Sequence, residues 1–182
     1  MGNTESVASN TDRPLPLVLE AKSLLDRGFH EAAVAKYRRS YDLYKESGAP
    51  ASAGRSLRMA VEAGILMEKP DYELAATAFE EVATLYLTNE ITALTAHVAL
   101  ANSIFCLLAA GFLATAKGKY AEFVKKDVKF ENSADGIAAR VIMEAYQNGN
   151  RNQALDRIDS FKDLQNMPLW KATLLDKIVA RL

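Results

Sequence analysis

The chain has 182 residues, of which 49% are hydrophobic and 25% are charged, and its formal net charge is -1. These values are typical of a globular protein, and the lack of a basic excess argues against general nucleic-acid binding. The single cysteine, Cys106, excludes an internal disulfide, as is usual in a reducing compartment.

The chain begins with a polar segment that precedes the first apolar pattern. Residues 1–14 are rich in Ser, Asn and Thr, which predicts a flexible N-terminal arm, with one helical domain over residues 15–182. The opening MGNTES also fits the N-myristoylation pattern M-G-x-x-x-[ST], which makes Gly2 a lipidation candidate. The alternative is an unmodified arm, because so short a pattern often arises by chance.

Beyond the arm, apolar residues recur with a helical period, and no segment shows the alternation of a strand. Prolines fall where helices are expected to begin, and several glycines fall where they are expected to end. We predict nine helices with approximate bounds 16–27, 30–47, 50–68, 71–87, 90–110, 112–127, 134–147, 151–163 and 168–181.

These predicted helices form a repeat of about forty residues. The segment EAAVAKYRRSYDLY aligns with ELAATAFEEVATLY, which pairs Ala33 with Ala75 and Tyr37 with Phe79. Two further copies follow, each after a short turn. A two-helix unit at this period predicts an all-α fold, a right-handed α-solenoid of hairpins like those of tetratricopeptide (TPR) repeats.

The middle of the chain carries no charge from Ile91 to Ala116, which is long enough to cross a bilayer. We favour two buried helices of the central repeat, because the turn expected at Gly111 interrupts the run. Cys106 lies in this stretch and is predicted to be a core residue rather than a nucleophile.

Catalytic and metal-binding patterns are missing from the sequence. The two histidines, His30 and His97, lie far apart and outside any zinc-ligand spacing, and there is no glycine-rich phosphate loop. We therefore predict a protein that is not an enzyme and that needs no metal or cofactor.

The last predicted helix is unpaired and contains Trp170, the only tryptophan. Because the end of a repeat array must be covered, we predict that this helix caps the fourth hairpin. The alternative for Trp170 is contact with a ligand.

Cations on the first helix of each hairpin are candidates for partner binding, because these helices often line the inner curve of a solenoid. The alternative is a solvated surface. The candidates are Lys22, Arg55, Arg58 and Arg140, with Lys171 and Lys177 on the last helix.

Four segments together resemble the soluble NSF attachment proteins (SNAPs). Within this family, the resemblance is greatest to the gamma type. The four segments are AAVAKYRRSYDLYKESGAPASAGRSL, IFCLLAAGFLATAKGKYAEF, ENSADGIAARVIMEAYQNGN and NMPLWKATL. The resemblance covers residues 16–182, or about the C-terminal three fifths of a family member. It implies a cytoplasmic, peripherally membrane-associated adaptor in vesicle trafficking. Such adaptors bind the four-helix SNARE bundle and recruit the ATPase NSF.

The resemblance also implies roles for individual residues. Arg55 stands where the family has a basic bundle-contacting residue, and Arg58 and Arg140 lie near other such positions. Glu144 matches an ATPase-facing acid, and Leu182 lies near the start of the family's leucine-bearing tail.

The sequence also departs from the family pattern. The family's N-terminal helices and membrane-touching loop have no counterpart, and Gln147 and Asn148 replace expected acids. An acyl group on Gly2 is a hypothetical replacement for that loop. We therefore expect a shortened member that binds SNARE bundles, with recruitment of NSF in question. The alternative is a generic TPR-like scaffold that binds an unrelated peptide or helix.

Overall fold

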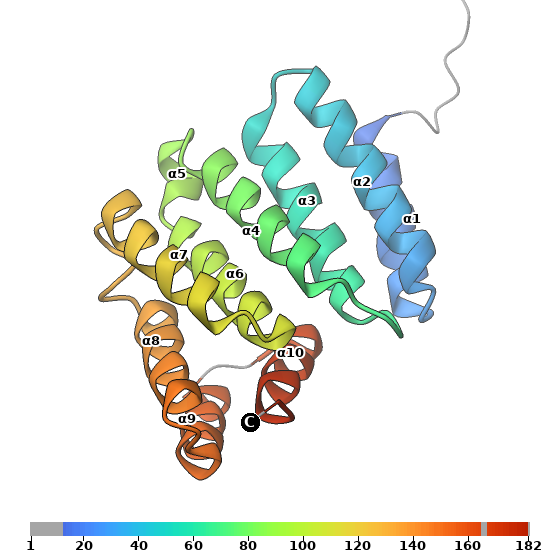
Figure 1. The fold of residues 1–182 in the computed structure, drawn as a ribbon. Coiled ribbons are helices and arrows are strands. Elements are labelled where there is room, and N and C mark those ends of the chain that lie inside the picture. The colour runs from blue at the N-terminus through green and yellow to red at the C-terminus, as the bar shows by residue number, and fades with distance from the viewer. Residues whose placement is uncertain (1–12, 165–166, 182) are drawn as a thin grey trace, which may run out of the picture.

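The computed structural model describes residues 13–164 and 167–181, which form ten helices and no strands (Figure 1). The all-α prediction is confirmed. The helices are α1 (Pro14–Asp26), α2 (His30–Glu46), α3 (Pro50–Ile65), α4 (Tyr72–Tyr86), α5 (Glu90–Ala93), α6 (Ala96–Ala110), α7 (Leu113–Lys126), α8 (Ala134–Gln147), α9 (Arg151–Leu164) and α10 (Leu169–Val179).

The predicted helix 90–110 is in fact two helices, so the prediction of a single helix there is wrong. The hydroxyl of Thr92 donates to the carbonyl oxygen of Tyr86 at 2.8 Å, and that of Thr95 donates to the carbonyl oxygen of Thr92 at 2.9 Å. Such side-chain to backbone hydrogen bonds compete with the helical ones. The long uncharged run is thereby divided, and no helix in the described ranges is long and apolar enough to cross a bilayer.

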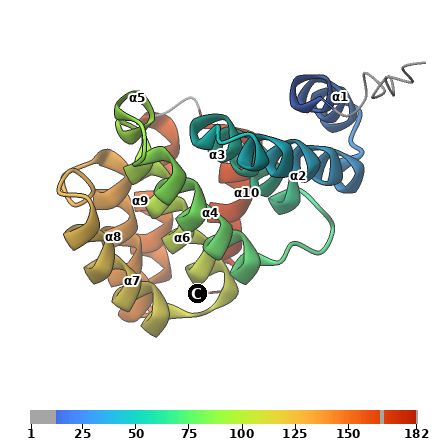
Figure 2. The same ribbon diagram turned by 90° about the horizontal axis from the view of Figure 1, so that it is seen from above.

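Helical hairpins stack side by side along the molecule, and the views in Figures 1 and 2 show them following a curve. The second helix of one hairpin packs on the first helix of the next, as α2 does on α3 and α4 on α6. Gly28 and Gly111 close two of the turns with φ values of 80° and 91°, which a residue with a side chain rarely adopts. The predicted role of these glycines is confirmed.

The repeat positions recognised in the sequence are core positions. Ala33 is fully buried and Ala75 nearly so, which lets the neighbouring helix approach, while Tyr37 and Phe79 are fully buried beside them. The core consists of two clusters. A small one joins α1, α2 and α3, and a larger one extends from α3 to α10.

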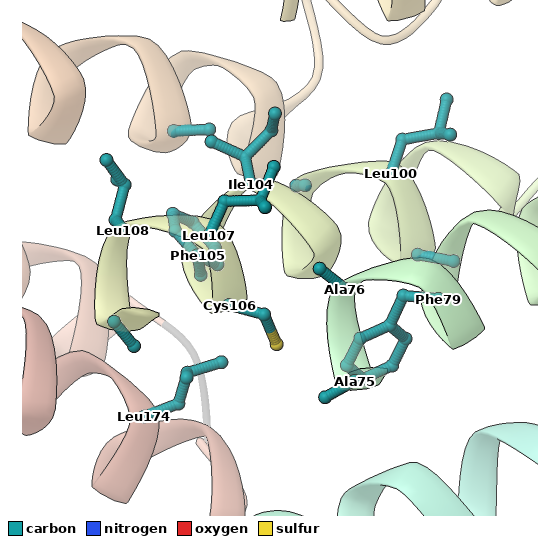
Figure 3. Close-up of a cluster of buried hydrophobic side chains, with 14 of the residues drawn as sticks. Ala75, Ala76, Phe79, Leu100, Ile104, Phe105, Cys106, Leu107, Leu108 and Leu174 are labelled. Atoms are coloured by element: carbon teal, nitrogen blue, oxygen red, sulfur yellow. The ribbon is translucent and has the colours of Figure 1, made fainter. Parts of the chain in front are cut away.

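The large cluster is densest around α6, which contributes apolar side chains on all sides. Figure 3 shows this region, where Cys106 projects among side chains from α4, α6 and α10. Cys106 is fully buried, which confirms its predicted place in the core.

The capping helix α10 packs more widely than the sequence predicts. It contacts α9 of the fourth hairpin, but it also lies against α6 and α3. The ring of Trp170 is buried, and its centroid lies 5.8 Å from that of Phe79 in α4. The tryptophan therefore joins α10 to the second hairpin.

Candidate functional site

The first helices of the hairpins, α1, α3, α6 and α8, form what we call the inner face. A groove of about 590 Å³ lies on this face between α3, the α5–α6 segment and the start of α10. Charged side chains of α3 form one wall, and mainly uncharged side chains of α5 and α6 form the other. The lining residues are Arg55, Arg58, Glu62, Tyr86, Ile91, Thr92, Thr95, Val98, Ala99, Asn102, Pro168, Trp170 and Lys171.

The close approach of α3 and α4 places Tyr86 at the edge of the groove. Gly54 allows the approach, because a Cβ atom at this position would lie only 2.9 Å from the ring of Tyr86. Tyr86 thereby reaches across from the end of α4 and lines the groove while remaining buried. A larger residue at position 54 would displace this ring.

Arg55 and Arg58 are brought together by the structure, one helical turn apart on α3. Arg55 is exposed and forms no ion pair with any residue in the described ranges. Arg58 is half-buried, and its Nη1 donates to Oε1 of Glu62 at 2.6 Å. Burial raises the pKa of the Glu62 carboxyl above its usual range, and the cations of Arg58 and Lys171 only partly offset this effect. Of the two arginines on this wall, Arg55 is therefore the one whose charge is exposed and not neutralised by an acid of the described chain.

Lys171 does not face solvent, which corrects the prediction that it belongs to an exposed set of cations. Its Nζ lies 2.6 Å from Oδ1 of Asp135 in α8, and both side chains are almost completely buried. The ammonium group also lies 5.0 Å from the ring centroid of Phe161. Lys171 therefore holds α10 in place rather than binding a partner through its charge.

The other predicted residues lie away from the groove lining. Lys22 on α1 and Lys177 on α10 are exposed. Arg140 on α8 is exposed, and its Nη1 lies 3.4 Å from Oε1 of Glu144. A predicted bundle-contacting cation and a predicted ATPase-facing acid are therefore ion-paired with each other. Gly2 and Leu182 lie outside the described residues.

Asn102 is a groove residue that the sequence interpretation did not single out. It is 2% exposed on α6, and its Oδ1 accepts no hydrogen bond from the described part of the chain. Its signal in the sequence is an amide within the apolar run ALANSIF. An asparagine in so apolar a segment could have been predicted to be a polar group with a role other than packing.

Neither a reactive thiol nor a cluster of metal ligands is found in the part of the chain that the structure describes. Burial raises the pKa of the Cys106 thiol, which keeps it protonated and unreactive at neutral pH. Within residues 13–164 and 167–181, no three His, Cys, Asp or Glu side chains gather as a metal site would require.

Comparison with known proteins identifies the family. The sequence model described as "Soluble NSF attachment protein, SNAP" matches residues 21–182. The vesicular-fusion protein SEC17 of Coprinopsis cinerea is 26% identical over 146 residues, which are 80% of this chain and 50% of that protein. The probable vesicular-fusion protein sec17 homologue of Schizosaccharomyces pombe is 24% identical over 149 residues, which are 81% of this chain and 50% of the homologue.

A third relative, the probable vesicular-fusion protein sec17 homologue of Neurospora crassa, is 23% identical over 146 residues, 80% of this chain and 49% of the homologue. The chain thus spans about half the length of these curated relatives. Its assignment to the gamma type stays a prediction. Because the family match covers most of the chain, and the helical hairpins agree with it, this protein belongs to the soluble NSF attachment protein family.

Proposed function

We propose that this chain is a non-enzymatic adaptor of vesicle trafficking that binds the assembled SNARE four-helix bundle along its inner face, with Arg55 as a central contact. The observation that carries the proposal is the match to the SNAP family over residues 21–182, together with an exposed and unpaired Arg55 beside the inner groove. The names of the relatives, which are vesicular-fusion proteins, support the same cellular process.

The physical basis is charge complementarity between a rigid curved surface and an acidic rod. Exposed Lys22 on α1 adds a cation to the helices of the inner face, whereas the charge of exposed Arg140 is partly neutralised by Glu144. Arg58 contributes less, because Glu62 already neutralises much of its charge. Contacts of this kind are individually weak and are screened by salt, so affinity depends on several of them acting together.

The experiment is a binding titration of the protein against a purified SNARE bundle at low and at high salt. We expect Arg55→Glu to weaken binding about tenfold at low salt and less at high salt, because reversing one interfacial charge costs about 1.4 kcal/mol. Arg39→Glu is the matched control, since Arg39 is also exposed but lies on α2, a second helix of a hairpin. Equal losses in the two variants would remove Arg55 from the proposed site and favour general charge attraction.

Recruitment of an NSF-type ATPase is a separate part of the proposal. Glu144 is the acid proposed to face the ATPase, and its ion pair with Arg140 links it to the bundle-binding side. Leu182 belongs to the same proposed contact but lies outside the described residues. The test is the ATPase rate of NSF with bundle and protein together, compared between the wild type and Glu144→Lys. Bundle binding without any increase in rate would limit the function to binding.

We propose that the protein works in the cytoplasm at the surface of membranes. The lipidation candidate Gly2 lies outside the described residues, and one acyl chain would provide reversible membrane association. Mass spectrometry of protein from its native cell tests this proposal. An unmodified Gly2 or a retained Met1 would contradict it.

A further inference from the structure

Asn102 is one of five side chains with a buried polar atom that has no hydrogen-bond partner among the described residues, the others being Tyr37, His97, Tyr120 and Asp127, and of the five only Asn102 lines the groove. Ser40 and Ser56 share a hydrogen bond, Ser103 donates to Glu80, and Lys171 is paired with Asp135. Asn102 is buried to the same degree, yet its Oδ1 has no partner among the described residues. An unpaired buried acceptor costs stability, so a protein retains one where another requirement outweighs that cost.

The position of Asn102 indicates what that requirement is. The side chain lines the groove on the inner face, on the wall opposite Arg55. A partner docked at Arg55 would therefore cover Asn102 as well. The described chain leaves this groove open, so a side chain of a docked partner can supply the missing hydrogen-bond donor.

The charges around the groove restrict the kind of donor. Arg55 carries an unpaired positive charge, which repels a lysine or arginine side chain and attracts a carboxylate. The carboxylate of the partner cannot itself donate to Oδ1. A side-chain amide is uncharged and carries both a donor and an acceptor, so it can pair with both polar atoms of an asparagine. Tyr86 and Trp170 provide the apolar surface against which the rest of such a side chain can pack.

We propose that Asn102 is a specificity-determining residue that recognises a glutamine or asparagine side chain on the helix docked against Arg55. The partner segment would thus present a carboxylate and a carboxamide on one face. This inference rests on the proposed function, because it concerns the same groove and the same docked helix. It adds a selective hydrogen bond to what charge attraction alone would provide.

The test uses the full chain and a purified SNARE bundle as the probe, with the variants Asn102→Leu and Arg55→Glu. Leucine keeps the branched shape of asparagine and removes both polar atoms. We expect Asn102→Leu to weaken bundle binding about tenfold at both low and high salt, because the lost contact is a desolvated hydrogen bond. Its melting temperature should equal or exceed that of the wild type, since an unpaired buried acceptor has been removed.

The donor is then located on the probe. Surface glutamines of the bundle are changed one at a time to methionine, and surface asparagines to leucine. At one position the change should weaken binding of the wild type and have no further effect on Asn102→Leu, which is the mark of a direct contact in a double-mutant cycle.

Three results would be decisive against these inferences. If Arg55→Glu weakens binding while Asn102→Leu binds as the wild type does, the role of Asn102 is refuted and the proposed function survives. A marked fall in the melting temperature of Asn102→Leu would make the amide a structural group and also refute the role. If the wild type does not bind the bundle at all, the proposed function fails, and the recognition role fails with it.

Discussion

The buried ion pair between Lys171 and Asp135 joins α10 to the first turn of α8 and should be essential for holding the capping helix. The N–O distance is 2.6 Å, and the two side chains are only 5% and 9% exposed. Removing either partner leaves a charge in the core without compensation, which costs about 3–5 kcal/mol. For a domain of this size, that corresponds to a loss of about 6–20 °C in melting temperature.

The two residues should be tested singly and together. Lys171→Met keeps the length of the side chain and removes its charge, and Asp135→Asn removes the opposite charge with little change in shape. The double variant contains no buried charge, and the rings of Phe161 and Phe105 near the ammonium group would still cover the methionine. We expect the double variant to be more stable than either single variant, because replacing a whole buried pair costs far less than breaking one.

The assay is equilibrium unfolding in urea, followed by circular dichroism and by tryptophan fluorescence. Trp170 is the only tryptophan and is buried one residue before Lys171, so its emission reports directly on the docking of α10. Lys177→Met is the control, because Lys177 is exposed on the same helix and its change should stay within about 0.5 kcal/mol. The reasoning is refuted if the losses of the single variants simply add in the double variant, or if Lys171→Met is as stable as the wild type.

Three further changes test the packing and the charges. Gly136→Ala should destabilise the protein by about 3 kcal/mol or more in urea unfolding, because the added Cβ would lie 1.8 Å from the carbonyl oxygen of Phe130. A variant as stable as the wild type would show that this close contact does not limit residue 136 to glycine. Tyr37→Phe should leave stability unchanged or raise it by about 1 kcal/mol, since the buried hydroxyl has no partner among the described residues, and a large loss would argue against this. Burial raises the folded-state pKa of Glu62 above the unfolded value of about 4.3. The folded state therefore gains stability from protonated Glu62 below the unfolded pKa, and it loses this stability as the pH rises through the folded pKa. The stability of Glu62→Gln relative to the wild type should therefore increase from pH 4 to pH 7, and a constant difference would contradict the raised pKa.

Much of the fold could be predicted because it depends on local patterns. Helical periodicity, proline and glycine positions and the forty-residue repeat each involve residues close together in the chain, and they located nearly every helix. The break before α6 was missed because it depends on hydroxyl groups of Thr92 and Thr95 that bond to particular carbonyl oxygens. Uncharged threonines leave the apolar pattern of a helix unchanged, so the pattern could not reveal the break.

The sequence by itself determined the all-α hairpin repeat, the buried Cys106, and Arg55 as a cation on the inner helices. Only the tertiary structure decided that α10 folds back onto α3 and α6, that Lys171 is buried against Asp135, and that Asn102 lines the same groove as Arg55. The reason is that each of these facts is a contact between distant segments. Periodicity states which face of a helix is apolar, but the neighbour that covers this face, and the polar groups trapped beside it, follow from how all the helices pack together.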